Sequence, residues 1–113
     1  MRVNAPSAMA PARFKVRISS TAQADLEIIA LQSAEDWGKT EAKRYIDTLE
    51  RGIDRIQTFP YAGRSVDYSL LQLRALPIVS HVVYYHVHEA DHVVDVVRVL
   101  HARMDAARHL KDI

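Results

Sequence analysis

The stretch HVVYYHVHEADHVVDVVRVL, residues 81–100, decides the fold. It holds two runs rich in Val and Tyr, separated by a Glu-Ala-Asp segment that is short enough for a hairpin turn. A register with Tyr85 facing Val96 and His86 opposite Asp95 puts like residues on each face of the pair, so we prefer it to a slip of one residue. The stretch therefore predicts two neighbouring antiparallel strands.

Further strand patterns lie upstream of this hairpin. In RFKVRIS, residues 13–19, apolar and basic residues alternate, which is typical of a half-buried strand. LLQLRAL, residues 70–76, is a third candidate strand, directly before the hairpin. The segment directly before this third strand, PYAGRSVDYS at residues 60–69, contains Pro60 and Gly63 and is predicted to be a loop.

Two amphipathic helices are predicted between the first strand and this loop. Ser20 and Gln23 fit a capping box at the start of the first helix, and Gly38 is a natural stop because glycine accepts a positive φ. Thr40 is expected to cap the second helix, which ends at the Phe-Pro pair before Tyr61. The link is very short, so the two helices form an αα-hairpin. We expect a core at their contact, formed by Trp37, Tyr45, Leu49 and Ile53.

The resulting element order is β-α-α-β-β-β, followed by a short helix in MDAARHLKDI, residues 104–113. Strands gathered after a helix pair indicate an α+β fold, with the αα-hairpin packed on a small, mainly antiparallel sheet. The Ala/Pro-rich residues 1–12 are expected to form a flexible tail, with Met9 as an alternative to Met1 as the start, and residues 13–113 a single domain.

Composition narrows the function classes. The chain has 113 residues and no cysteine, which excludes disulfides, a thiol nucleophile and cysteine-ligated zinc and suits the reducing cytoplasm. No apolar run reaches the ~20 residues that a membrane helix needs. The net charge of +1 does not indicate direct sequence-specific binding of nucleic acid. Acids are concentrated in the predicted helices, so the basic residues near the strands are less neutralised than the total suggests.

No established catalytic signature is present. The three glycines form no phosphate-binding loop, and neither a Gly-x-Ser-x-Gly motif nor a zinc-protease helix occurs. His86, His88 and His92 are three imidazoles close to one turn, but they lack a fixed ligand spacing, and the alternative is an exposed strand face with His86 paired to Asp95. We therefore predict no metal site and no cofactor.

Adjacent tyrosines and a group of basic residues are the remaining candidates. Tyr84 and Tyr85 point to opposite faces of one strand, and we expect Tyr85 in the core and Tyr84 at a contact surface. His101 is suited to general acid–base work, with nearby arginines stabilising charge on a phosphate. In the alternative, Arg98 pairs inside the sheet and Asp105 caps or pairs with the last helix. The candidate partner- or target-binding residues are Arg64, Arg74, Tyr84, Arg98, His101 and Arg103.

Several linked segments resemble the ParE-type toxins of type II toxin–antitoxin modules, within the wider ParE/RelE superfamily. They are ISSTAQADLEII at the first helix, YIDTLERGIDRIQTFPYAGR at the second, LRALPI and HVVYYHV in the middle strands, and DVVRVLHARMD at the end of the last strand. The resemblance runs from residue 14 to about residue 110. It rests on the order and spacing of the segments together.

The resemblance implies a cytoplasmic toxin that blocks DNA gyrase by binding and is not an enzyme. It also implies a ParD-like antitoxin that wraps the toxin in a hetero-oligomer. The same superfamily contains RelE-like ribosome-dependent messenger-RNA endonucleases, which are the alternative. In that case Arg74, His101 and Arg103 would be catalytic. Nothing aromatic follows Tyr85, so a base-stacking or proton-moving tyrosine is missing near the end of the chain, and this disfavours the nuclease.

Overall fold

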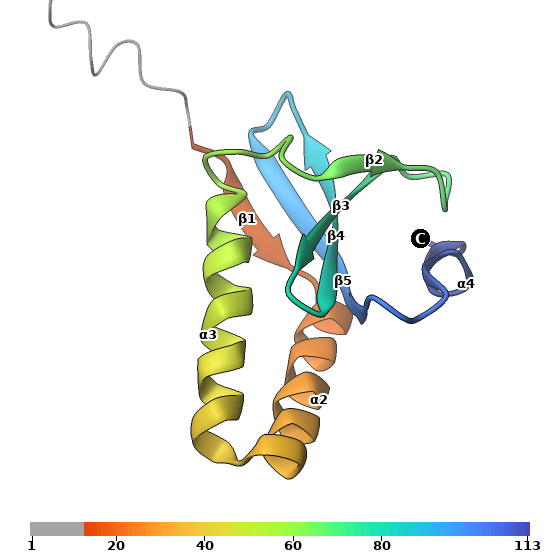
Figure 1. Cartoon of the computed structure of the whole chain (residues 1–113). Helices are drawn as coiled ribbons and strands as arrows, with labels where there is room; N and C mark the ends of the chain where they lie inside the picture. Colours follow the sequence, from red (N-terminus) through yellow and green to blue (C-terminus); the bar gives the residue numbers. More distant parts are fainter. Residues whose placement is uncertain (1–12) are drawn as a thin grey trace, which may run out of the picture.

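The structure is a computed structural model that describes residues 13–113, so the tail predicted for residues 1–12 lies outside the described residues. The predicted element order is confirmed, with one strand added, and the fold is α+β (Figure 1). The elements are β1 (Lys15–Ile18), α2 (Ser20–Trp37), α3 (Lys39–Arg55), β2 (Arg64–Val66), β3 (Leu73–Ile78), β4 (His81–His88), β5 (Val93–His101) and α4 (Ala106–Leu110). Within this part of the chain, no helix is long and apolar enough to cross a membrane.

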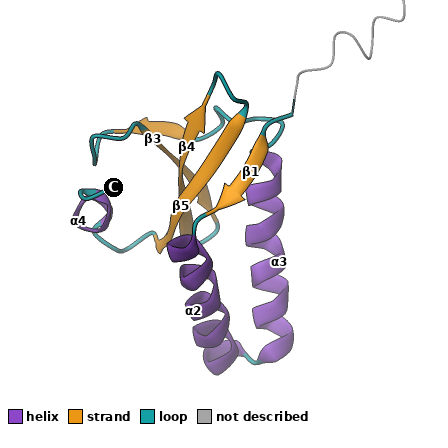
Figure 2. Ribbon diagram, turned by 180° about the vertical axis from the view of Figure 1, so that it is seen from behind, coloured by secondary structure: helices purple, strands orange, loops and turns teal. Residues whose placement is uncertain are grey.

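The five strands form one mixed sheet in the order β1-β5-β4-β3-β2. β1 pairs with β5 in parallel, and the other three pairings are antiparallel, as the prediction of a mainly antiparallel sheet requires. Figure 2 shows the α2–α3 hairpin beside the sheet and the short α4 on its other side. β2 occupies a segment for which the sequence predicted only a loop. It is a three-residue edge strand, too short to show an alternation of apolar and polar residues.

The β4–β5 hairpin has the predicted register. Tyr85 pairs with Val96 and His86 with Asp95. The register then shifts between Tyr84 and Tyr85, so that Tyr84 pairs with Arg98 and one extra residue sits in β5. A bulge of this kind leaves one strand a residue longer and changes which way the following side chains point. It therefore determines how the end of β5, with its basic residues, is presented.

The sheet buries apolar side chains on both faces, and this overturns one expectation. The helix-covered face holds the larger cluster, in which Tyr85 is fully buried as predicted. The opposite face carries a second cluster, where Leu110 of α4 packs with Leu73, Leu100 and Tyr84. Tyr84 is only 6% exposed, so its prediction as a surface residue is wrong. The helix that covers Tyr84 is only five residues long, which is too short to show a strong amphipathic pattern in the sequence.

The helix ends differ from the prediction by a residue or two. Ser19, not Ser20, caps α2, because its side chain accepts the backbone N–H of Ala22. Gly38 stops α2 with a φ of 90°, as expected, but it is also the N-terminal boundary of α3, so Thr40 does not cap that helix. Leu49 and Ile53 are buried as predicted and Tyr45 is partly buried. Trp37 is 58% exposed, so its prediction as core is wrong: it lies at the open tip of the hairpin.

Candidate interaction surfaces

The predicted site residues fall at two ends of the sheet. Arg74 on β3 lies opposite Tyr85 of β4, whereas His101 on β5 lies opposite His81 of β4. Tyr85 and His81 are four residues apart, or roughly 13 Å along a strand. The structure therefore does not bring Arg74 together with His101 and its neighbour Arg103.

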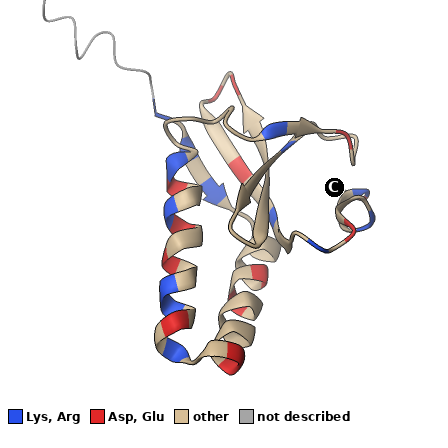
Figure 3. Cartoon of the chain, viewed as in Figure 1, with Lys and Arg blue, Asp and Glu red and all other residues tan. Residues whose placement is uncertain are grey.

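The first surface, which we call the α3–β3 groove, lies between the second half of α3 and the start of the β3–β4 turn. Its volume is about 930 Å³. Its floor is apolar, with Ile56, Leu76 and Ile78 among its lining residues, and Arg51 and Arg55 stand on its rim. No Asp or Glu lines it. Figure 3 shows charges of both signs along α3, while α2 carries acidic residues alone.

The loop that closes this groove is held from below by strand residues. The backbone N–H of Gly63 donates to the Tyr85 hydroxyl at 2.9 Å, and Arg74 Nη1 donates to the Gly63 carbonyl at 2.7 Å. The Arg74 guanidinium also lies over the ring of Tyr61, 4.8 Å from its centroid. Burial raises the pKa of Tyr85, so its hydroxyl stays neutral. Tyr61 and Phe59 are thus exposed aromatics on a braced loop.

The second surface, which we call the β5-end pocket, lies between α2 and the end of β5 and has a volume of about 400 Å³. Arg98 lines it but is engaged: its Nε and Nη2 donate to the two oxygens of Asp25 at 2.8 and 3.0 Å. The same carboxylate accepts the backbone N–H of Val99 at 2.9 Å. This hydrogen-bonded pairing raises the pKa of Arg98. Arg98 therefore braces α2 against β5. The prediction that Arg98 pairs inside the sheet is wrong, because its partner, Asp25, lies on a helix.

His101 has a neighbour that the sequence reading missed. The ring of His81 lies 5.0 Å from that of His101, centroid to centroid. Tyr45 Oη lies 2.6 Å from Nδ1 of His81, and the backbone N–H of Arg103 donates to Nδ1 of His101 at 3.1 Å. The predicted hairpin register, extended away from the turn, sets His81 opposite Leu100. The bulge shifts the pairing by one residue and sets His81 opposite His101, so the sequence alone did not predict this contact.

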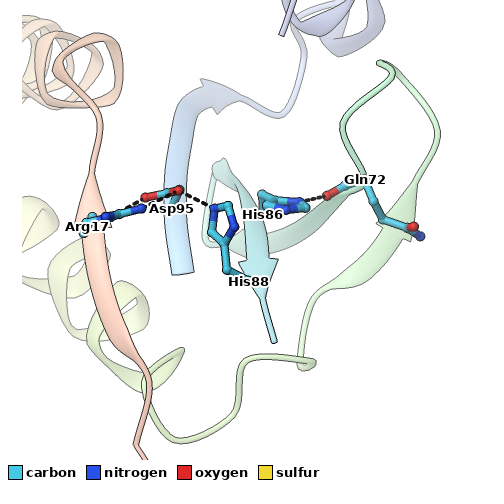
Figure 4. Close-up of polar contacts among 5 residues, drawn as sticks. All are labelled: Arg17, Gln72, His86, His88 and Asp95. Atoms are coloured by element: carbon cyan, nitrogen blue, oxygen red, sulfur yellow. Dashed lines mark hydrogen bonds and ion pairs between the residues drawn. The ribbon is translucent and has the colours of Figure 1, made fainter. Parts of the chain in front are cut away.

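A third polar group lies on the sheet face away from the α2–α3 hairpin (Figure 4). Arg17 of β1 donates to both oxygens of Asp95 at 2.8 and 3.0 Å, and His88 Nε2 donates to the same carboxylate at 2.6 Å. The hydrogen bond from Arg17, and then that from His88, lower the pKa of Asp95. His86 Nδ1 instead donates to the Gln72 carbonyl at 2.6 Å, so its predicted side-chain pairing with Asp95 is wrong.

The remaining candidates are simpler to place. Arg64 on the edge strand β2 and Arg103 after β5 are exposed. Tyr84 is buried under α4 and presents no surface. Asp105 stands at the N-cap position of α4, as predicted, although its side chain makes no capping hydrogen bond. Among residues 13–113, no three His, Asp or Glu side chains are grouped as metal ligands.

Comparison with known proteins assigns the family. Residues 16–106 match the model of the ParE toxin of the type II toxin–antitoxin system parDE. Toxin ParE1 of Mycobacterium tuberculosis is 40% identical over 93 residues, covering 82% of this chain and 94% of that protein. Toxin ParE1 of Caulobacter vibrioides is 35% identical over 94 residues, covering 83% and 95%.

Solved structures show the same fold at low identity. One described as the chromosomal ParDE TA system from P. aeruginosa has a TM-score of 0.67 at 16% identity and covers 80% of this chain and 98% of that one. The toxin–antitoxin complex RelBE2 of Mycobacterium tuberculosis gives 0.63 at 16% identity, with 79% and 98% covered. Taken with the family match and the curated relatives, these findings show that the chain belongs to the ParE family of type II toxin–antitoxin toxins.

Proposed function

We propose that the chain is a toxin that inhibits DNA gyrase by binding it, without chemistry of its own, and that a ParD-like antitoxin neutralises it in a hetero-oligomer in the cytoplasm. Membership of the ParE family supports the toxin role. The P. aeruginosa relative is described as a ParDE system, which supports a ParD-like partner.

The observation that carries the choice of binding over catalysis is the separation of the three nuclease candidates. A general acid–base residue must lie within hydrogen-bond reach of the proton it moves, with charge-stabilising groups at the same phosphate. Arg74 lies opposite Tyr85 and is occupied by the Gly63 carbonyl and the Tyr61 ring, whereas His101 and Arg103 lie at the other end of β4–β5. The set does not converge on one reacting group.

The α3–β3 groove supports antitoxin binding. An apolar floor with arginines on the rim, and no lining acid, suits an amphipathic segment with acidic flanks that folds as it binds. Phe59 and Tyr61 are large, exposed and held on a braced loop, which is the composition expected of residues that contribute strongly to binding. We assign this groove to the antitoxin, and the exposed Arg64 and Arg103 to partner or target contacts.

The experiment that tests the proposal runs two assays on the same purified chain. In a supercoiling assay, we expect loss of gyrase activity, and adding the ParD-like antitoxin should restore it. In a translation assay with ribosomes, we expect no cleavage of messenger RNA. Untouched supercoiling together with messenger-RNA cleavage would replace the proposal with the RelE-like nuclease, and His101→Ala would then cost about two orders of magnitude in rate.

A further inference from the structure

The two histidines of the β5-end pocket each have their Nδ1 engaged by a neighbour. Nδ1 of His101 accepts a backbone N–H, and an amide can only donate, so the neutral ring carries its proton on Nε2. Tyr45 Oη accepts the backbone N–H of Ser80 at 3.2 Å, and its hydroxyl can in addition either donate to Nδ1 of His81 or accept from it at 2.6 Å. When Tyr45 donates to Nδ1, the neutral His81 ring carries its proton on Nε2, and a charged His81 ring carries a proton on both nitrogens.

Both Nε2–H groups are unused donors. Within residues 13–113, neither Nε2 has a hydrogen-bond partner, while both rings line the β5-end pocket. The two rings come from directly opposed strand residues and their centroids lie 5.0 Å apart, so one carboxylate is small enough to accept from both. A divalent metal does not suit His101, because a metal requires a ring nitrogen that carries no proton, and the free nitrogen of His101 is the protonated one.

We propose that His81 and His101 form a docking site for a carboxylate side chain of a partner protein, with their two Nε2–H groups as the donors. The rim of the pocket is apolar: Ile28, Trp37 and Met104 are 52%, 58% and 40% exposed. An acidic residue flanked by apolar ones would bury that rim, as at the centre of protein–protein interfaces. This inference does not depend on gyrase being the target.

The charges around the pair disfavour a nucleic-acid ligand. The charged and titratable groups come from four elements: Asp25 and Asp36 on α2, Tyr45 on α3, His81 on β4, and Arg98 and His101 on β5. Asp25 and Arg98 neutralise each other, and no further Lys or Arg of residues 13–113 lines the pocket, which also contains Asp36. A nucleic-acid backbone needs several cations to replace its counterions. A single carboxylate needs only the two donors and one proton.

That proton makes the site sensitive to pH. Burial, and then the nearby His101, lower the pKa of His81, so the ring is neutral when the pocket is empty. A bound carboxylate favours the charged ring, and binding therefore takes up a proton. Affinity for a carboxylate should rise as the pH falls towards 6.

Histidine-detected NMR of the full chain tests the proposal, with sodium acetate as the probe and sodium chloride at equal ionic strength as the control. We expect the ring signals of His81 and His101 to shift and saturate, with half-saturation on the order of 10 mM for so small a ligand. Half-saturation should fall about threefold from about pH 7.5 to about pH 6. His109, an exposed histidine on α4, should not saturate.

Two variants of His101 test whether its N–H donor binds the carboxylate, and three results would overturn the proposal. His101→Leu should abolish the saturable shift at His81, whereas His101→Gln, which keeps an N–H donor, should retain it; thermal unfolding confirms that both fold. Nδ1–H tautomers in the ring ¹⁵N shifts would overturn the proposal, as would an acetate response equal to that of His109. A single-stranded RNA that shifts the two rings at a lower concentration than acetate would also overturn it, in favour of a nucleic-acid site.

Discussion

The α3–β3 groove and the β5-end pocket both reach the β3–β4 turn, one against α3 and the other against α2, and they differ in the kind of charge they offer. The groove has permanent positive charge from Arg51 and Arg55, with no lining acid. The pocket has paired or titratable groups, since Arg98 is taken by Asp25 and His81 is neutral when empty. From this difference we expect antitoxin binding in the groove to be insensitive to pH near neutrality, and carboxylate binding in the pocket to take up a proton.

Gly63→Ala should disrupt the loop that closes the α3–β3 groove and leave the β5-end pocket unaffected. A Cβ at this position would lie 2.7 Å from Tyr85 Oη and 2.9 Å from the Ala75 carbonyl oxygen, and the backbone cannot move aside easily. We expect a loss of about 3 kcal/mol in the free energy of unfolding, measured by chemical denaturation. The folded-state emission of Trp37, the single tryptophan and a pocket residue, should not change. A loss below about 0.5 kcal/mol would show that the loop is not braced as described.

Asp25→Asn should disrupt the β5-end pocket and leave the α3–β3 groove unaffected. It removes a bidentate ion pair whose side chains are 20% and 12% exposed, and leaves the Arg98 charge without its partner. We expect a loss of about 2 kcal/mol in the free energy of unfolding, with a changed Trp37 emission. Asp36→Asn, an exposed carboxylate on the same helix, is the matched control and should cost under about 0.5 kcal/mol. Equal effects of the two variants would contradict the bracing role.

Arg55→Glu should weaken binding of the antitoxin to the groove while leaving the fold intact. Reversing one rim charge opposite an acidic segment should lower affinity about tenfold, or ~1.4 kcal/mol, measured by calorimetry with purified antitoxin. Arg44→Glu is the control, because Arg44 is exposed on the same helix, pairs with Glu41 and does not line the groove. If both variants bind alike, the groove is not where the antitoxin lies.

The smallest effect expected is the pH dependence of stability due to His81. Its pKa in the folded chain is lowered below the usual 6.5, so unfolding takes up a proton in the pH range between the folded and unfolded values. Falling pH through that range therefore favours unfolding. Because the ring is partly exposed, we expect less than about 1 kcal/mol between about pH 7.5 and about pH 5. Urea titrations of the wild type and His81→Gln should show a steeper dependence in the wild type; identical slopes would refute the shift.

The fold was largely predictable because strong local signals agreed with one another. Alternation in the strands, the short turn and the Gly38 stop each gave the correct element. Tyr84 was misplaced because its cover, α4, depends on a single buried residue, Leu110. Trp37 was misplaced because helical periodicity cannot tell that the hairpin tip extends past the sheet.

The candidate surfaces were harder to predict, because they depend on pairings between distant residues. The sequence placed Arg98 and Arg74 among free basic residues, yet each is held by a partner 73 or 11 residues away along the chain. His81 stood at the start of a strand with no motif around it, and only the bulge at Tyr84/Tyr85 sets it opposite His101. Composition and periodicity do not predict the register between distant strands or the position of a bulge.

The parallel pairing of β1 with β5 has a consequence for synthesis of the protein. β1 is made before both long helices and three further strands, and its partner strand β5 leaves the ribosome only after all of them. Until then its edge is unpaired and α2 has no finished surface to rest on. A message that is cut or terminated before residue 93 therefore yields a chain that cannot complete its sheet.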